Sequence, residues 1–254
     1  MDLPLGWHTD LAVRRAGGSL VEEHRDHVVV RTPTNPVFHW GNFLLVTDPA
    51  AVDEADRWVP RFEAEFPDAP HRAIGLVAEP GDDSGWYALG LVVEHEDVLA
   101  AEACPMPAPL ADGYEVRQLG APEDWSQSID LEIEEFPGDE EFQRRAAATR
   151  AAMSGRGRAG WFGAFRAGRL AAQLGIVDCG DGIARYQTVL TEDEHRRQGL
   201  ASHLIGVAAR WAADRGAHTW VIIADADSPA SRLYQARGFV HTDRSVQAYR
   251  RPPA

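Results

Sequence analysis

A basic turn with a single glycine, Arg196–Ala201, carries the clearest chemical signal in the sequence. It follows a stretch rich in strand-forming residues and precedes a run with apolar residues at helical spacing. Gly199 can adopt a left-handed conformation or let a ligand approach the backbone closely. The free amide groups of the first helical turn, together with Arg196 and Arg197, suit an anion such as a diphosphate. The simpler alternative is an ordinary strand-to-helix turn with arginines at the surface.

A second pattern follows in the same half of the chain. Ser228-Pro229 is typical of a helix start, and Gly238 of a helix end. Tyr234 lies between them, and its hydroxyl group could donate a proton to a leaving group. The residues that define the pattern are Asp227, Ala230, Leu233, Tyr234, Gly238 and Phe239.

Together these motifs resemble the two signatures of the GNAT superfamily of acyl-CoA-dependent acyltransferases. The first is Arg/Gln-x-x-Gly-x-Gly/Ala, matched here at Arg196, Gly199 and Ala201. The second is Asn-x-x-Ala-x-x-Leu-Tyr-x-x-x-Gly-Phe, with Asp227 in place of the usual asparagine. Each motif alone is weak, but their order and context are those of the family. The resemblance covers roughly residues 114–250.

The resemblance implies acetyl-CoA as the acyl-donor substrate. A backbone amide of Val189 or Leu190 would polarise the thioester carbonyl, beside a neighbouring strand, Thr219–Ile223, that splays away. Asp227 would contact the pantetheine arm or cap the helix at Ser228, and both readings stay open. The residues expected to bind the coenzyme are Val189, Leu190, Thr191, Arg196, Arg197, Gln198, Gly199, Leu200, Ala201, Ser202 and Asp227.

The resemblance also implies direct attack of an amine on the thioester, with Tyr234 as the general acid. The general base is harder to place, because the strand Tyr186–Thr191 contains no acidic residue. Glu192, directly after the strand, is the predicted base. Further candidates are Glu132, Glu134 and Glu135.

The predicted function is an acyl-CoA-dependent N-acyltransferase, most simply one that moves an acetyl group to a primary amine on a small molecule or peptide. A non-catalytic acyl-CoA sensor or interaction module is the main alternative, favoured by the missing strand carboxylate. An enzyme acting on nucleotide phosphates is a weaker third possibility, because no Gly-Lys-Ser/Thr sequence ends the turn.

The strands and helices that must position these residues can be predicted from the sequence of the second half of the chain. The expected strands are 114–119, 160–166, 170–178, 183–191, 219–223, 239–240 and 246–250. The expected helices start at Pro122 and cover 139–153, 200–214 and 228–237. Residues 103–113 hold three alternating prolines and are expected to form a linker.

The first half, residues 1–102, alternates strands and short helices. Expected strands are 27–31, 38–46, 71–77, 91–94 and 97–101, with a helical stretch from 48 to 66. Trp86–Val92 is similar to Tyr234–Val240, which suggests an internal repeat. The position that corresponds to the diphosphate-binding turn carries acidic residues, which would repel a diphosphate. These are Asp53, Glu54 and Asp56. The predicted fold class is therefore α/β (α+β): a degenerate GNAT-like domain over 1–102 and a catalytic one over 114–254, each with a mixed, mostly antiparallel sheet flanked by helices.

Composition sets the remaining expectations. A net charge of −14 argues against nucleic acid as a partner and is compatible with a cationic amine. The only cysteines are Cys104 and Cys179, and the ten histidines form no metal-binding motif, so no metal is predicted. No apolar run is long enough to span a membrane, and no secretory signal is evident. We expect a cytoplasmic monomer or homodimer.

Overall fold

The computed structural model describes residues 3–137 and 140–252. The chain divides into two compact units. Unit 1 contains Met1–Val98, Ala224–Ala226 and Thr242–Ala254, and unit 2 contains Leu99–Ile223 and Asp227–His241. Among the described residues, no helix is both long enough and apolar enough to cross a membrane.

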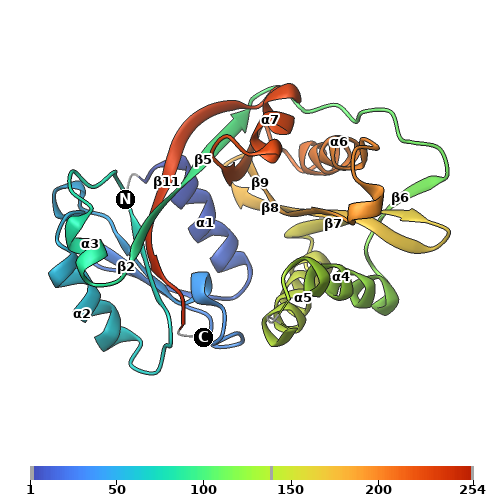
Figure 1. Ribbon diagram of the computed structural model, residues 1–254. Helices are drawn as coiled ribbons and strands as arrows, with labels where there is room; N and C mark the ends of the chain where they lie inside the picture. The colour runs from blue at the N-terminus through green and yellow to red at the C-terminus, as the bar shows by residue number, and fades with distance from the viewer. Residues whose placement is uncertain (1–2, 138–139, 253–254) are drawn as a thin grey trace. The chain divides into compact units, whose positions relative to one another are not determined.

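Unit 1 is a mixed sheet between helices (Figure 1). Its sheet has the order β1-β2-β3-β4-β11, in which β3 and β4 run parallel and the other pairs are antiparallel. The strands begun in the first half are β1 (Leu20–Glu23), β2 (His27–Arg31), β3 (Phe43–Val46), β4 (Arg72–Leu76) and β5 (Val92–Ala101). The helices are α1 (Leu5–Ala16), η1 (His39–Gly41), η2 (Pro49–Ala51), α2 (Ala55–Glu65) and α3 (Ser84–Ala88).

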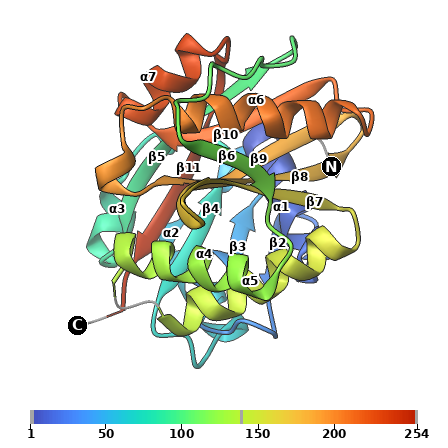
Figure 2. The ribbon, with the colours of Figure 1, turned by 90° about the vertical axis from the view of Figure 1, so that its right-hand side faces the viewer.

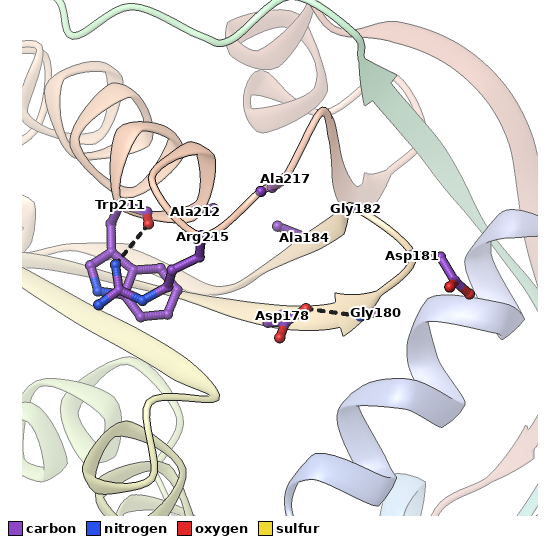
Figure 3. Close-up of a pocket in the computed structure, with 10 residues that line it drawn as sticks. Asp178, Gly180, Asp181, Gly182, Ala184, Trp211, Ala212, Arg215 and Ala217 are labelled. Atoms are coloured by element: carbon purple, nitrogen blue, oxygen red, sulfur yellow. Dashed lines mark hydrogen bonds between the residues drawn. The ribbon is translucent and has the colours of Figure 1, made fainter.

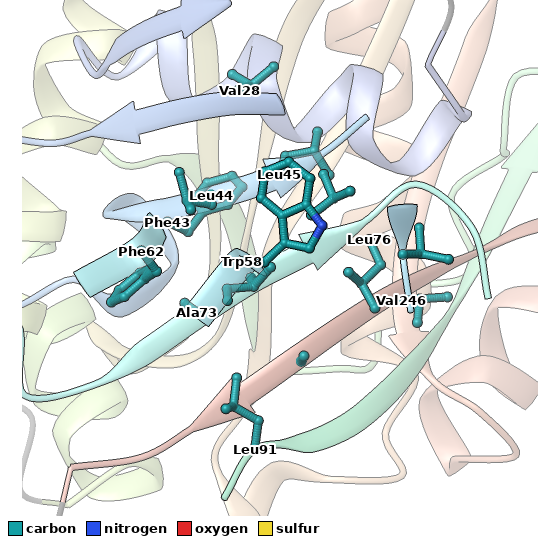
Figure 4. Packing of buried hydrophobic residues seen from close by; sticks show 14 of the residues in the cluster. Val28, Phe43, Leu44, Leu45, Trp58, Phe62, Ala73, Leu76, Leu91 and Val246 are labelled. Atoms are coloured by element: carbon teal, nitrogen blue, oxygen red, sulfur yellow. The ribbon is translucent and has the colours of Figure 1, made fainter. Parts of the chain in front are cut away.

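The core of unit 1 is formed by the continuous apolar strands β2 and β3 and by aromatic side chains from the helices (Figure 4). Trp58 of α2 is 1% exposed, and its indole N–H donates to the Ala51 carbonyl at 2.7 Å. Trp7 of α1 occupies the space above Gly75, where a Cβ atom would lie 2.4 Å from its ring. Both tryptophans therefore bury their rings while satisfying their polar groups.

Unit 2 is a layered structure in which α4 and α5 cover one face of the sheet and α6 covers the other (Figures 1 and 2). Its strands follow the order β10-β9-β8-β7-β6. They are β6 (Tyr114–Gln118), β7 (Ala159–Arg166), β8 (Arg169–Gly180), β9 (Ile183–Thr191) and β10 (Thr219–Asp225). The last strand of the chain, β11 (Val240–Arg250), belongs mostly to unit 1. The helices are α4 (Pro122–Glu135), α5 (Glu140–Gly155), η3 (Asp193–His195), α6 (Leu200–Ala213) and α7 (Pro229–Ala236).

The predicted fold class, with mixed, mostly antiparallel sheets flanked by helices, is confirmed. The division between units differs from the boundaries that the sequence suggested. Thr242–Ala254, expected in the second domain, belongs to unit 1, because β11 pairs with β4 from Val246↔Leu76 to Arg250↔Arg72. Conversely, β5 passes from unit 1 to unit 2 at Leu99. Each unit thus includes a strand segment from the other half of the chain.

Several element predictions were wrong in detail. Two strands were each predicted as two separate pieces. Strand β5 was expected as 91–94 and 97–101, and β11 as 239–240 and 246–250. Polar residues within these strands, such as His95 and Asp243, interrupt the apolar pattern on which the prediction depended. The strand expected at 38–46 begins only at Phe43, after the turn η1. Helix α1 was not predicted. The helix expected from Asp139 is observed from Glu140, and Asp139 itself lies outside the described residues.

The internal repeat is visible in the local geometry of both units. A short helix ends in each case at a glycine with positive φ, Gly90 at 75° and Gly238 at 93°, and a long strand follows. A parallel strand pair also occurs in each unit, β3 with β4 and β9 with β10. The repeat therefore extends from sequence to topology.

Candidate active site

The turn Arg196–Ala201 forms the start of α6. Gly199 is the N-cap residue, with φ of 75°, and no side chain caps the helix. The first backbone bond of the helix runs from the His203 amide to the Gly199 carbonyl, at 2.9 Å. The amides of Leu200, Ala201 and Ser202 precede that bond and are the groups that an anion would accept from.

The space on the side-chain face of Gly199 is open. A Cβ atom placed on Gly199 would meet only the Pro109 carbonyl oxygen, at 4.0 Å. Arg197 is exposed and also has a positive φ of 62°, which directs the chain around the turn. Backbone amides, a helix N-terminus and an exposed guanidinium group together match the chemistry of a diphosphate.

Strand β9 contains a bulge beside this turn. Gln173 of β8 pairs with Leu190, and Gly175 of β8 pairs with Gln187. Two residues of β9, Thr188 and Val189, therefore lie opposite the single β8 residue between Gln173 and Gly175. Thr188 has φ of 50°, a costly conformation for a β-branched residue. Backbone strain of this kind clusters at functional sites, and a bulge leaves an amide group unpaired. Val189 and Leu190 were the predicted amide donors to the thioester.

The neighbouring strands β9 and β10 pair over only a short length. Their parallel ladder joins Thr219–Val221 to Ile183–Arg185, and in the described chain it ends there. Strand β9 then continues to Thr191 past the bulge. This is the separation predicted between β9 and Thr219–Ile223, and it leaves β9 amide and carbonyl groups available for an extended ligand.

Tyr234 lies on α7 and is 5% exposed, with its ring packed edge-on against Phe239 at 6.3 Å. Burial raises the pKa of Tyr234 to about 12. The hydroxyl group is therefore protonated at neutral pH, as a hydrogen-bond donor to a leaving group must be.

Asp227 does not cap α7. The N-cap residue is Ser228, whose hydroxyl oxygen accepts from the Ser231 amide at 3.0 Å. Asp227 adopts a positive φ of 57°, and its carbonyl oxygen accepts from Arg232 at 2.6 Å. The capping alternative for Asp227 was therefore wrong, which leaves its carboxylate available for the predicted ligand contact.

Glu192 lies at the far end of β9. Its carboxylate is 3.4 Å from His195 and 3.9 Å from Arg169. It follows the bulge residue Val189 by three positions, or about 10 Å along an extended strand. This position does not bring Glu192 to the bulge.

A buried polar cluster lies under α4, on the opposite sheet face from α6. Glu132 of α4 is 2% exposed, and its Oε1 accepts from Gln173 Nε2 at 2.9 Å and from Arg150 of α5. Gln173 pairs with Leu190, next to the bulge. Within the described chain, the buried Gln173 Oε1 and Trp161 Nε1 have no hydrogen-bond partner. Glu132 is therefore the buried carboxylate that reaches the sheet beside the bulge.

Sequence reasoning missed most of this cluster. Glu132 was one of several open candidates, and Trp161 was not assigned a polar role. Gln173 and Arg150 were not singled out. The available signal was the single polar residue inside the apolar run Leu170–Val177, because a buried amide needs a partner.

Tyr114 also supports the turn. Its hydroxyl group bonds Gln198 Oε1 at 3.1 Å and His195 Nδ1 at 2.7 Å. Gln198, predicted to bind the coenzyme, is thereby fixed to β6 through its side-chain oxygen.

A pocket of about 190 Å³ lies at the other end of β9 and α6 (Figure 3). Its lining includes the β8–β9 turn and the end of α6, where Arg215 stacks over Trp211 at 4.0 Å. It contains none of the predicted site residues. Among the residues that the structure describes, no three His, Cys, Asp or Glu side chains are grouped to hold a metal ion.

Comparisons with known proteins concern the family and the fold. The profile of the acetyltransferase (GNAT) family matches residues 125–239. No curated protein matches the sequence.

Solved structures share the fold of the whole chain at low sequence identity. A functionally unknown conserved protein from Staphylococcus epidermidis is 12% identical, with a TM-score of 0.74 over 93% of this chain and 95% of its own. A GCN5-related N-acetyltransferase from Kribbella flavida is 16% identical, with a TM-score of 0.66 over 99% of this chain and 97% of its own. A tandem GNAT protein from the clavulanic acid biosynthesis pathway is 17% identical, with a TM-score of 0.59 over 93% of this chain and 84% of its own. With the first sequence motif at the open start of α6 and the second on and around α7, residues 125–239 form a domain of the acetyltransferase (GNAT) family.

Proposed function

We propose that unit 2 is an acyl-CoA-dependent N-acyltransferase that transfers an acetyl group to a primary amine by direct attack. The main observation that supports this proposal is that three features occur together on β9 and α6. These are the uncapped helix start at Gly199, the bulge at Thr188–Val189 and the early end of the β9–β10 ladder.

The chain's own residues would divide the binding task. Amides of Leu200, Ala201 and Ser202 and the Arg197 side chain would hold the diphosphate. The half-buried segment Val189–Thr191 of β9 would pair with the pantetheine amides as one strand pairs with another. Bound acetyl-CoA supplies a thioester whose carbonyl carbon accepts the amine.

The remaining roles concern charge and protons. An amide at the bulge would donate to the carbonyl oxygen as negative charge develops there. Tyr234 would donate a hydrogen bond to the leaving sulfur. Full proton transfer from a group of pKa about 12 to an ordinary thiolate of about 8.5 is uphill by roughly 5 kcal/mol. The Tyr234 hydroxyl therefore stabilises the leaving group mainly by hydrogen bonding.

Two carboxylates, Glu192 and Glu132, are alternative candidates for the general base, and an experiment must distinguish them. Glu192 was the sequence prediction, but it lies about 10 Å along the strand from the bulge. Glu132 lies under Gln173, which pairs with Leu190 beside the bulge. Position favours Glu132.

A non-catalytic acyl-CoA sensor remains the second candidate, and one observation favours it. Strand β9 reads Ile-Ala-Arg-Tyr-Gln-Thr-Val-Leu-Thr and carries no acidic side chain.

The two functions separate in one assay. Purified protein is incubated with acetyl-CoA and a panel of primary amines, and thiol release and acetylated products are measured. An enzyme releases thiol in proportion to product with at least one amine. Tight acetyl-CoA binding without thiol release across the panel supports the sensor, and absence of binding contradicts both.

A further inference from the structure

Arg196, the first residue of the coenzyme-binding turn, already has protein partners. Its Nε donates to the Thr191 carbonyl oxygen at 3.1 Å. Its Nη2 lies 3.0 and 3.3 Å from the two carboxylate oxygens of Glu135 and 2.8 Å from Asp193. One guanidinium group therefore joins the end of β9, the turn η3 and the last residue of α4.

The second arginine of the turn differs. Arg197 is exposed, and within the described part of the chain its side chain makes no ion pair. Of the two positive charges that the motif offers a diphosphate, one is available and the other is shared by two carboxylates. Helix α4 contributes acidic residues but no lysine or arginine.

We propose that Glu135 occupies Arg196 in place of the coenzyme diphosphate, so that coenzyme binding must displace this carboxylate. The proposal rests on the proposed function of the turn. Glu135 is then a positioning residue: it holds the Arg196 side chain and the end of α4 together until the diphosphate competes for the same guanidinium group.

Displacement of Glu135 would also affect the part of the site where the amine is proposed to bind. Glu135 is the last residue of α4, and Glu132 lies one turn earlier on the same helix. Release of Glu135 frees the helix end next to the buried cluster of Glu132, Gln173 and Trp161. Because such coupling is reciprocal, an amine that attracts Glu135 also strengthens coenzyme binding.

A double-mutant cycle on acetyl-CoA affinity tests the competition. Calorimetry at low salt measures the Kd of the wild type, Glu135→Gln, Arg196→Gln and the double variant. Exposed ion pairs are weak, so Glu135→Gln is expected to tighten binding by about two- to fivefold. That gain should vanish in the Arg196→Gln background, and high salt should reduce it.

Asp130→Asn is the matched control, because it removes one exposed carboxylate from the same helix. In the described chain Asp130 has no ion pair. If the acidic helix only repels the coenzyme in general, Glu135→Gln and Asp130→Asn should increase the affinity for acetyl-CoA equally. That result would overturn the proposal. So would a gain from Glu135→Gln that survives removal of Arg196. If the wild type binds no acetyl-CoA at all, the proposed function fails first, and the two failures are thus distinguishable.

Discussion

Tyr234 shows how one buried side chain can serve both packing and chemistry. Its ring packs against Phe239, and its burial holds the hydroxyl pKa at about 12. The sequence motif predicted the residue, but not its degree of burial, which depends on how α7 and the following strand segment close over it.

Replacing Tyr234 with phenylalanine should keep the packing and remove the hydroxyl group. We expect kcat to fall by about 10²-fold while the Kd for acetyl-CoA changes little. Steady-state kinetics and calorimetry on the same preparation measure both quantities. An unchanged kcat would exclude Tyr234 from the mechanism.

Glu132→Gln and Glu192→Gln separate the two candidate bases. A glutamine at position 132 still offers an oxygen to Gln173 and Arg150, so the fold should persist with a lower melting temperature. We expect kcat at saturating substrates to fall at least tenfold for Glu132→Gln, and to stay within about twofold for Glu192→Gln. The reverse ranking would return the role to Glu192.

At the scale of elements, α4 depends on the carboxylate near its start. Asp124 accepts from the amides of Gly120 and Ala121, both at 3.1 Å, and from Arg117 at 2.6 Å. These contacts, led by Arg117, lower the pKa of Asp124 to about 2. A carboxylate that fixes the first turn of α4 also fixes where Glu132 meets the sheet.

Asp124→Asn should therefore destabilise the protein by about 2 kcal/mol at neutral pH. The folded-state pKa lies below the ordinary value of 3.8, so this stability is present above pH 3.8 and is lost as the pH falls toward 2. Urea unfolding at pH 7 and near pH 3 measures the difference, which should shrink in acid. Equal differences at both pH values would contradict the assignment.

Several elements could be predicted where the local signals agree. Strands β2 and β9 match the predicted bounds, and α6 starts at the predicted residue, because runs of β-branched residues and a glycine before an apolar stripe are local features. The bulge at Thr188 and the Glu132–Gln173 contact could not be predicted. Both depend on how distant strands and helices meet, which no single stretch encodes.

At the scale of the whole molecule, the two units share topology but differ in chemistry. Unit 1 has Asp53 and Glu54 where unit 2 has its basic turn, and the sequence showed this difference directly. The assignment of β11 to unit 1 was not predictable, because strand pairing between chain ends leaves no local pattern.

Unit 1 contains a histidine that should make the protein sensitive to acid. His71 is 1% exposed, stacks on His39 at 4.3 Å, and bonds the Asn42 carbonyl at 3.0 Å. Burial lowers the pKa of His71 to about 4. Between pH 6.5 and 4 the unfolded chain binds the proton more strongly, so stability falls as the pH falls.

The expected loss between pH 7 and pH 4 is up to about 3 kcal/mol from this group. His71→Gln should remove that part of the pH dependence, and urea midpoints at several pH values measure it. His8→Gln, which replaces a histidine of α1 outside this stack, serves as the control. An unchanged pH slope in His71→Gln would show that other groups cause the acid sensitivity.

A calorimetric titration with acetyl-CoA measures whether the start of α6 at Gly199 binds the diphosphate. We expect the wild type to bind acetyl-CoA with one site per chain. We expect Gly199→Glu, which puts a negative side chain into the turn, to remain folded and to bind none. Absence of binding by the wild type, or equal binding by the folded Gly199→Glu variant, would contradict diphosphate binding at this helix start.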